Sequence, residues 1–216
     1  MPSHKPVFLA VAGNIGAGKS SLTKLLAERF GWKPYFESVD DNPYLADFYN
    51  DMRRWSFHLQ IYFLANRFKN HRQIVESGES VIQDRSIYED AMIFARNLHD
   101  MGNMDPRDYE NYVSLFRVMT DYLRPPDLMI YLRASVDTLL AQIRRRGRTF
   151  EQGIERRYLE LLNRHYEEWI ADYNIGPLLV VKSDSIDFVN RSEDLEKIAV
   201  SVERKLQEVA IPHKTT

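Results

Sequence analysis

Apolar residues follow two alternating patterns along the chain. Short runs that are apolar throughout, such as residues 7–12 and 178–181, are typical of strands buried on both faces of a parallel sheet. Longer segments place apolar residues three or four positions apart, as Leu22, Leu25 and Leu26 do, which predicts helices with one buried face. Because strands and helices alternate throughout, the pattern predicts an α/β protein with a doubly wound parallel sheet.

The pattern places five strands and the helices between them. We expect strands at residues 7–12, 34–37, 80–83, 127–132 and 178–181, and helices at 20–30, 43–49, 53–76, 87–98, 105–124, 135–146, 155–173 and 192–209. Local signals support some of the ends: Gly31 stops the first helix, and Asp105 with Pro106 begins a later one. No repeat, low-complexity tract or linker interrupts the order, so we expect a single domain over residues 1–216.

Composition excludes several classes of function. The 216 residues carry a formal net charge of −2, which argues against non-specific nucleic-acid binding because that needs a basic surface. There is no cysteine, so neither disulfides nor thiolate metal sites can form, and the six histidines show no ligand spacing. The first apolar run is too short to cross a membrane. We therefore expect a cytoplasmic protein without nucleic-acid or membrane partners.

The first apolar run leads into a glycine-rich segment, Gly13, Asn14, Ile15, Gly16, Ala17, Gly18, Lys19 and Ser20. It fits G-x-x-x-x-G-K-[ST] at every required position and lies between a predicted strand and a predicted helix. Backbone N–H groups and the helix N-terminus can therefore surround phosphate oxygens. Lys19 can reach the β- and γ-phosphates, and the Ser20 hydroxyl can hold Mg²⁺ that arrives with ATP. The segment predicts a nucleoside triphosphate site but does not identify the phosphate acceptor.

Two further strands end in charged residues. Glu37 follows the second strand, and Asp84 and Arg85 follow the third. Parallel strands present their carboxyl ends at one edge of the sheet, so these groups should face the phosphate loop. Each residue alone is equally consistent with a solvated surface or a helix cap. Together they are what transfer to an alcohol needs: a base, a magnesium ligand and a cation for the transferred phosphoryl group.

An arginine-rich segment lies between two predicted helices and contains Arg144, Arg145, Arg146, Gly147 and Arg148. Such clusters can bind nucleic acid, and most are solvated surfaces. In a phosphate-loop protein, a mobile segment with arginines can also close over the phosphates and exclude water. We therefore expect an arginine-bearing lid at about residues 144–154.

Together these motifs resemble the deoxynucleoside kinase family over nearly the whole chain, particularly the bacterial deoxyadenosine/deoxyguanosine kinases. The matching segments are the phosphate loop, Asp84-Arg85-Ser86, Arg146-Gly147-Arg148 with Glu151-Gln152-Gly153-Ile154, and Asp187-Phe188, which is similar to the family's adenine-holding loop. The chain has Gln142 at the start of the lid, where relatives often carry another arginine. Arg144 or Arg145 is a candidate to replace that arginine.

The resemblance implies a role for each matching residue. Glu37 would be the general base on the 5′-hydroxyl, Arg85 would contact Glu37 and the 5′-end, and Lys19 would act on the phosphates. Ser20 and Asp84 would hold magnesium. The ATP site would further include Ser21, Arg146, Arg148, Asp187 and Phe188. The deoxynucleoside would contact Tyr49 and Glu151 at its 3′-hydroxyl, Gln60, Arg67 and Asp90 at the base edge, and Trp55 and Phe94 around the base. Spacing supports this, because Gln60 and Arg67 share one helix face and Asp90 and Phe94 share another.

The predicted function is ATP-dependent phosphorylation of the 5′-hydroxyl of a deoxynucleoside, either a purine deoxynucleoside (deoxyadenosine or deoxyguanosine) or deoxycytidine. The alternative is a thymidylate-type nucleoside monophosphate kinase, which shares the phosphate loop, the Asp-Arg motif and the lid. Glu37 would repel an acceptor phosphate and suits a neutral hydroxyl, which favours the nucleoside. The resemblance also implies a homodimer formed through two long helices.

Overall fold

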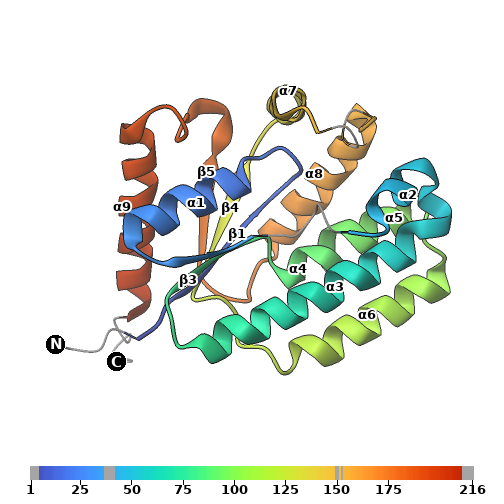
Figure 1. Ribbon diagram of the computed structural model, residues 1–216, viewed down its shortest axis with the longest axis horizontal. Helices are drawn as coiled ribbons and strands as arrows, with labels where there is room; N and C mark the ends of the chain where they lie inside the picture. Colours follow the sequence, from blue (N-terminus) through green and yellow to red (C-terminus); the bar gives the residue numbers. More distant parts are fainter. Residues whose placement is uncertain (1–4, 37–41, 149–150, 152, 211–216) are drawn as a thin grey trace.

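The computed structural model describes residues 5–36, 42–148, 151 and 153–210, and these residues form a five-stranded parallel sheet between two layers of helices (Figure 1). The strand order is β2-β3-β1-β4-β5. The strands are β1 (Phe8–Gly13), β2 (Lys33–Tyr35), β3 (Val81–Asp84), β4 (Leu128–Arg133) and β5 (Leu178–Lys182). All six residues of β1 are buried, because this strand is central and both of its faces are covered.

The helices connect successive strands and cover both faces of the sheet. They are α1 (Lys19–Phe30), α2 (Leu45–Asn50), α3 (Met52–Ser77), α4 (Ile87–Glu89), α5 (Arg96–Asp100), α6 (Pro106–Thr120), α7 (Val136–Arg146), α8 (Arg156–Ala171) and α9 (Ser192–Ala210). A π-helical turn, η1 (Asp90–Ala95), joins α4 to α5, and a short 3₁₀ turn, η3 (Ser183–Ser185), follows β5.

Side chains of β1 alternate between two cores. Leu9 and Val11 point to one core, which they share with residues of α1, α7 and α9. Ala10 and Ala12 point to the other core, which includes residues of α3, η1, α6 and α8. α3 and α6 lie side by side in this second layer (Figure 1). The small side chains of Ala10 and Ala12 leave room for this thicker layer beneath the carboxyl ends of the strands.

The structure confirms the predicted strand–helix alternation and corrects several boundaries. The helix expected at residues 87–98 is divided by η1, and the helix expected to reach residue 124 ends at Thr120. The second strand covers Lys33–Tyr35 rather than residues 34–37. Across the described ranges, none of the helices has the length and apolar character needed to span a membrane.

Candidate active site

The phosphate loop lies at the carboxyl end of β1 and leads directly into α1. Gly16 and Gly18 have φ angles of 84° and 94°, which only glycine adopts readily. A Cβ atom at Gly16 would lie 2.8 Å from the backbone oxygen of Leu139, so close packing on α7 also requires glycine here. The Lys19 Nζ donates a hydrogen bond to the Asn14 carbonyl oxygen at 3.1 Å, which holds the ammonium group inside the loop.

The loop is also fixed from α8. The Asn14 side chain donates to the Leu159 carbonyl oxygen at 3.1 Å and to Asn163 Oδ1 at 2.6 Å. Asn14 was expected in the ATP site, and its side chain is used to attach the loop to the helix that follows the lid. Ala17 is buried, while Ile15 and Gly16 border the main cavity.

Ser20 and Asp84 meet where the phosphate loop faces the end of β3. The Ser20 hydroxyl donates a hydrogen bond to Asp84 Oδ2, and Asp84 is almost completely buried. A hydroxyl and a carboxylate are hard oxygen donors of the kind Mg²⁺ prefers. The described residues contain no cluster of three or more histidine or acidic side chains able to hold a metal. The donor set therefore fits an ion that takes most of its ligands from nucleotide phosphates and water.

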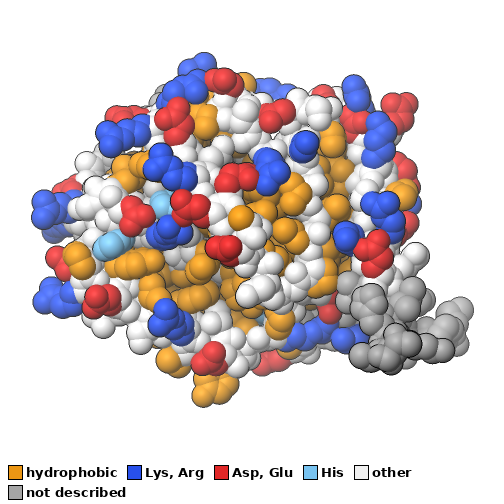
Figure 2. Space-filling model, turned by 180° about the vertical axis from the view of Figure 1, so that it is seen from behind, with side chains coloured by type: hydrophobic (Ala, Val, Ile, Leu, Met, Phe, Trp, Pro, Cys, Tyr) orange, Lys and Arg blue, Asp and Glu red, His pale blue; other side chains and the backbone are white. Residues whose placement is uncertain are grey.

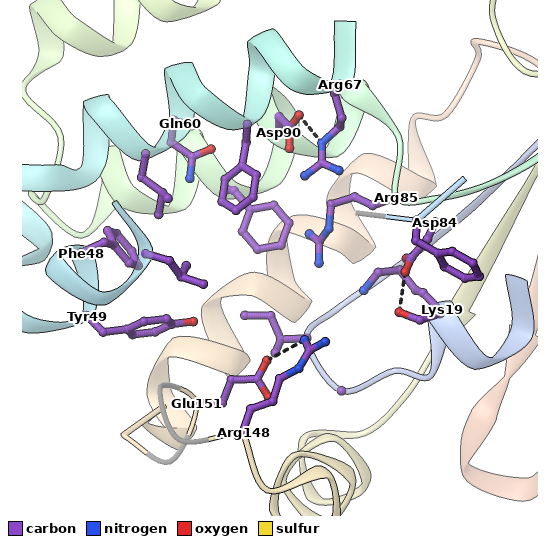
Figure 3. A pocket seen from close by; sticks show the side chains of 18 of the residues that line it. Lys19, Phe48, Tyr49, Gln60, Arg67, Asp84, Arg85, Asp90, Arg148 and Glu151 are labelled. Atoms are coloured by element: carbon purple, nitrogen blue, oxygen red, sulfur yellow. Dashed lines mark hydrogen bonds and ion pairs between the residues drawn. The ribbon is translucent and has the colours of Figure 1, made fainter. Parts of the chain in front are cut away.

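Arg85 occupies a backbone conformation that is rare for a residue with a side chain. Its φ is 66°, and its N–H donates to the Val11 carbonyl oxygen at 2.9 Å. This turn aims the side chain into the cavity, where the guanidinium lies 4.2 Å from the centroid of the Phe94 ring (Figure 3). Non-glycine residues with positive φ often occur at functional sites, where surrounding structure holds them.

A buried polar cluster forms another wall of the cavity. Arg67 of α3 and Asp90 of η1 form an ion pair with an Nε–Oδ2 distance of 2.5 Å, and their exposed fractions are 5% and 1%. Gln60 is 3% exposed, and its buried Oε1 atom has no hydrogen-bond partner among the described residues. Burying an acceptor without a partner costs free energy, which a donor on a ligand would recover. The cluster therefore offers charged and amide groups to a polar ligand.

These elements enclose a cavity of about 280 Å³ at the carboxyl edge of the sheet. Figure 3 shows Gln60, Arg67 and Asp90 along one side, Lys19 and Asp84 at another end, and Tyr49 and Glu151 pointing inward from α2 and the segment after α7. Its lining residues from the sequence prediction are Ile15, Gly16, Lys19, Ser20, Tyr49, Gln60, Arg67, Asp84, Arg85, Asp90, Phe94, Arg146, Arg148 and Glu151. Residues from six segments distant in sequence thus converge on one cavity.

Ion pairs between arginines and Glu151 connect the described part of the predicted lid. Glu151 is 5% exposed. It accepts hydrogen bonds from Arg146 Nε, at 3.0 Å, and from Arg146 Nη2. Arg148 Nη1 forms an ion pair with Glu151 Oε1 at 3.6 Å. A second groove beside the phosphate loop is lined by Gly16, Gly18, Lys19, Ser20, Ser21, Gln142, Arg145, Arg146 and Arg148. Arg145, rather than Arg144, therefore lies beside Gln142 in this groove.

Several predicted residues lie away from the cavity. Trp55 packs beside Tyr44 at 5.8 Å between ring centroids and does not line the cavity. Asp187 is exposed and accepts hydrogen bonds from the Asn190 side chain. Phe188 is buried against the phosphate loop, and a Cβ atom added at Gly18 would lie 3.1 Å from its ring. The predicted base, Glu37, lies outside the described residues.

The structure adds lining residues that sequence reasoning missed: Phe36, Leu45, Phe48, Leu59, Phe63 and Tyr158. Phe63 could have been found, because it shares a helix face with Gln60 and Arg67. Tyr158 carries no local signal, since it enters from α8. Burial raises the pKa of Tyr158 to about 12, against the opposing effect of Arg85, so its hydroxyl stays protonated at neutral pH.

The comparisons agree on one family. The deoxynucleoside kinase family model matches residues 9–207. The deoxyadenosine/deoxycytidine kinase of Bacillus subtilis is 47% identical over 196 residues, 90% of each chain, and the deoxyguanosine kinase of the same organism is 39% identical over 90% of this chain and 95% of its own. The solved structure of deoxyadenosine kinase from M. mycoides with bound dATP has a TM-score of 0.82 at 32% identity, covering 91% of this chain and 100% of that one. The chain therefore belongs to the deoxynucleoside kinase family.

Proposed function

We propose that this deoxynucleoside kinase transfers the γ-phosphate of ATP to the 5′-hydroxyl of deoxyadenosine or deoxyguanosine, with deoxycytidine as a further acceptor. The observation that carries the choice of base is the buried cluster of Gln60, Arg67 and Asp90 beside the Phe94 ring. A flat heteroaromatic base needs an aromatic contact on its face and polar partners along its edge. This wall of the cavity offers both.

The polar cluster favours bases that carry an exocyclic amino group. The Asp90 carboxylate accepts hydrogen bonds, the Arg67 guanidinium donates them, and the Gln60 amide does both. Adenine and cytosine present an amino donor next to a ring nitrogen acceptor, and guanine carries an amino donor at C2 beside its ring N–H, whereas thymine has no exocyclic amino group. Relatives support the same set of bases, since they are named as kinases of deoxyadenosine, deoxycytidine and deoxyguanosine.

At the other end of the cavity, we assign the phosphates to the glycine-rich loop and Lys19. Ser20 and Asp84 would hold Mg²⁺, which supplies charge neutralisation and alignment of the β- and γ-phosphates. Arg85 faces the same space and would stabilise charge on the transferred phosphoryl group. Glu37 stays the predicted general base on the 5′-hydroxyl, a role drawn from the sequence.

The segment 144–154 would act as a lid. Glu151 holds Arg146 in an ion pair, and the Tyr49 side chain points into the same part of the cavity (Figure 3). If Glu151 accepts a hydrogen bond from the sugar 3′-hydroxyl, that interaction competes with Arg146 for the same carboxylate. Acceptor binding would then release Arg146 toward the phosphates, together with Arg148.

We also propose a homodimer formed through α3 and α6. Leu115 and Val118 on α6, with Tyr122 just beyond it, are 43%, 57% and 82% exposed and lie at helical spacing along one face. The neighbouring α3 adds half-buried Phe57 and Ile61. Sedimentation should show a dimer that Val118→Glu converts to monomers. A monomer for the wild-type chain would contradict the proposal.

The acceptor is tested by turnover with ATP–Mg²⁺ and a panel of deoxyadenosine, deoxyguanosine, deoxycytidine, thymidine and thymidine monophosphate. We expect kcat/KM for the purine deoxynucleosides and deoxycytidine to exceed that for thymidine at least about tenfold, because thymine has no exocyclic amino group that could donate a hydrogen bond to Asp90. Preference for thymidine would contradict the assignment of Gln60, Arg67 and Asp90. Turnover of thymidine monophosphate alone would indicate the monophosphate kinase alternative.

On the reverse face of the molecule, basic and acidic side chains are intermixed and apolar side chains gather between them (Figure 2). Among the described residues seen on this face, basic side chains do not form a continuous surface. The mixture of charges agrees with the near-neutral net charge of the chain.

A further inference from the structure

Glu89 is a completely buried carboxylate for which the proposed reaction has no role. It precedes Asp90, yet its side chain faces the phosphate loop. Its Oε1 accepts a hydrogen bond from the Gly13 N–H at 3.1 Å. Its Oε2 accepts from the Ser86 N–H at 2.7 Å and from the Ser86 hydroxyl at 3.1 Å. One carboxylate thus joins the first residue of the phosphate loop to the last residue of the Asp84-Arg85-Ser86 motif.

Tyr166 of α8 completes this connection. Its hydroxyl lies 2.8 Å from the Gly13 carbonyl oxygen and 2.7 Å from Glu89 Oε1, so its single proton is shared between these two acceptors. Its ring stacks on Tyr131 of β4, with 5.5 Å between centroids and an interplanar angle of 17°. Burial, with the Glu89 carboxylate nearby, holds the pKa of Tyr166 well above its usual range, so it remains a hydroxyl donor.

The contacts of Glu89 lie just beyond the last pairing between β1 and β3, where the phosphate loop and the turn into α4 begin. The last residue pair between β1 and β3 is Val11 with Asp84, and the Arg85 N–H still reaches the Val11 carbonyl oxygen. Beyond that point the phosphate loop and the turn into α4 separate. Glu89 bridges the two backbones there, between Gly13 and Ser86, and Ser86 directly follows Asp84 and Arg85, which are both proposed to act in the reaction.

We propose that Glu89, supported by Tyr166, is a positioning residue that sets the placement of the phosphate loop relative to Asp84 and Arg85. The inference rests on the phosphate-site roles proposed above. Phosphoryl transfer depends almost entirely on alignment and electrostatic stabilisation, and a misplacement of about 1 Å can lower the rate by about a hundredfold. Glu89 is not among the residues that line the cavity, so its effect should appear in turnover and much less in binding.

Glu89→Gln is the direct test. The substituted amide keeps the shape of the side chain but presents an NH₂ group to N–H donors at Gly13 or Ser86, so one of the two connections must loosen. We expect kcat with deoxyadenosine to fall about ten- to a hundredfold, while KM for ATP and for deoxyadenosine changes by less than about threefold. Tyr166→Phe removes only the hydroxyl and should lower kcat in the same way. The double variant should lose less than the product of the two single losses, because the residues act together.

Asp127→Asn is a matched control, because Asp127 accepts a backbone hydrogen bond at the other end of β1. Asp127 Oδ2 accepts from the Phe8 N–H at 2.8 Å, at the start of β1, as Glu89 accepts from Gly13 at its end. This control should lower the melting temperature and leave kcat unchanged.

The proposal is overturned if Glu89→Gln keeps kcat within about twofold of wild type, or if Asp127→Asn lowers kcat as much. If Glu89→Gln does not fold, the proposal is tested by Tyr166→Phe alone. A kcat of Tyr166→Phe equal to that of the wild type would then overturn the proposal. Failure of the wild-type enzyme to phosphorylate any deoxynucleoside is a separate result, which would refute the proposed function and this inference with it.

Discussion

Asp90→Asn should destabilise the protein strongly, because it removes one charge from a buried ion pair. Arg67 and Asp90 are 5% and 1% exposed, so the guanidinium cannot turn to water when its partner is neutralised. Breaking a buried pair in this way costs about 3–5 kcal/mol of unfolding free energy. For a chain of this size, about 2–4 °C of melting temperature corresponds to each kcal/mol, which predicts a decrease of about 6–20 °C.

The assay is thermal and urea unfolding of the wild type and variant, with and without deoxyadenosine. We expect deoxyadenosine to raise the melting temperature of the wild type and to raise that of Asp90→Asn much less, because Asp90 is the carboxylate proposed to accept from the amino group of the base. Glu196→Gln is the control: its ion pair with Arg29, at 2.8 Å, lies on the surface and should hardly affect the melting temperature.

A double variant separates stability from recognition. Arg67→Met with Asp90→Leu replaces the pair with apolar side chains, a change that is often neutral or stabilising for buried pairs. It should recover most of the melting temperature without recovering turnover. A melting temperature for Asp90→Asn within about 2 °C of wild type would refute the view that the pair is buried and mutually compensated.

Three further substitutions probe the phosphate site. Lys19→Ala should lower turnover by at least about a hundredfold with little change in melting temperature, and an unaffected rate would contradict the phosphate-loop assignment. Glu37→Gln should leave ATP binding near normal in a calorimetric titration and reduce turnover by about two orders of magnitude, so equal turnover would remove Glu37 as the base. Gly16→Ala should weaken ATP binding and stability, because the added Cβ would lie 2.8 Å from the Leu139 carbonyl oxygen. Gly31→Ala should lower stability alone, because Gly31 has a φ of 67° but an added Cβ would meet no other described residue within 4 Å, apart from its chain neighbours.

Much of the fold could be predicted because strands that are buried on both faces appear in the sequence as uninterrupted apolar runs. Residues 8–12 and 128–132 are apolar without interruption, which is typical of a strand covered on both faces, and the structure places them in β1 and β4 near the centre of the sheet. The edge strand β2 was less well predicted. Lys33 and Pro34 are exposed, so burial left no pattern to mark its ends.

The candidate site was predictable where several residues form one local motif. The phosphate loop is contiguous, and its glycines have a steric reason that sequence alone reveals. Glu89 and Tyr166 were not found, because they meet the loop across 76 and 153 residues of chain. The exposed location of Asp187 and the packing of Trp55 against Tyr44 likewise depend on tertiary contacts that periodicity does not encode.

The π-helical turn η1 constrains the number of residues between Ser86 and Asp100. Each π-helical turn holds more residues than an α-helical one, and here it lets Asp90 and Phe94 border the cavity while Met92 is 40% exposed. Deleting one residue between Ser86 and Asp100 would restore a regular α-helical pitch, and inserting one would add a further irregularity; either change would rotate every later side chain about the helix axis. The number of residues in this stretch is therefore constrained as strictly as the buried side chains that it carries, such as Glu89, Asp90 and Phe94.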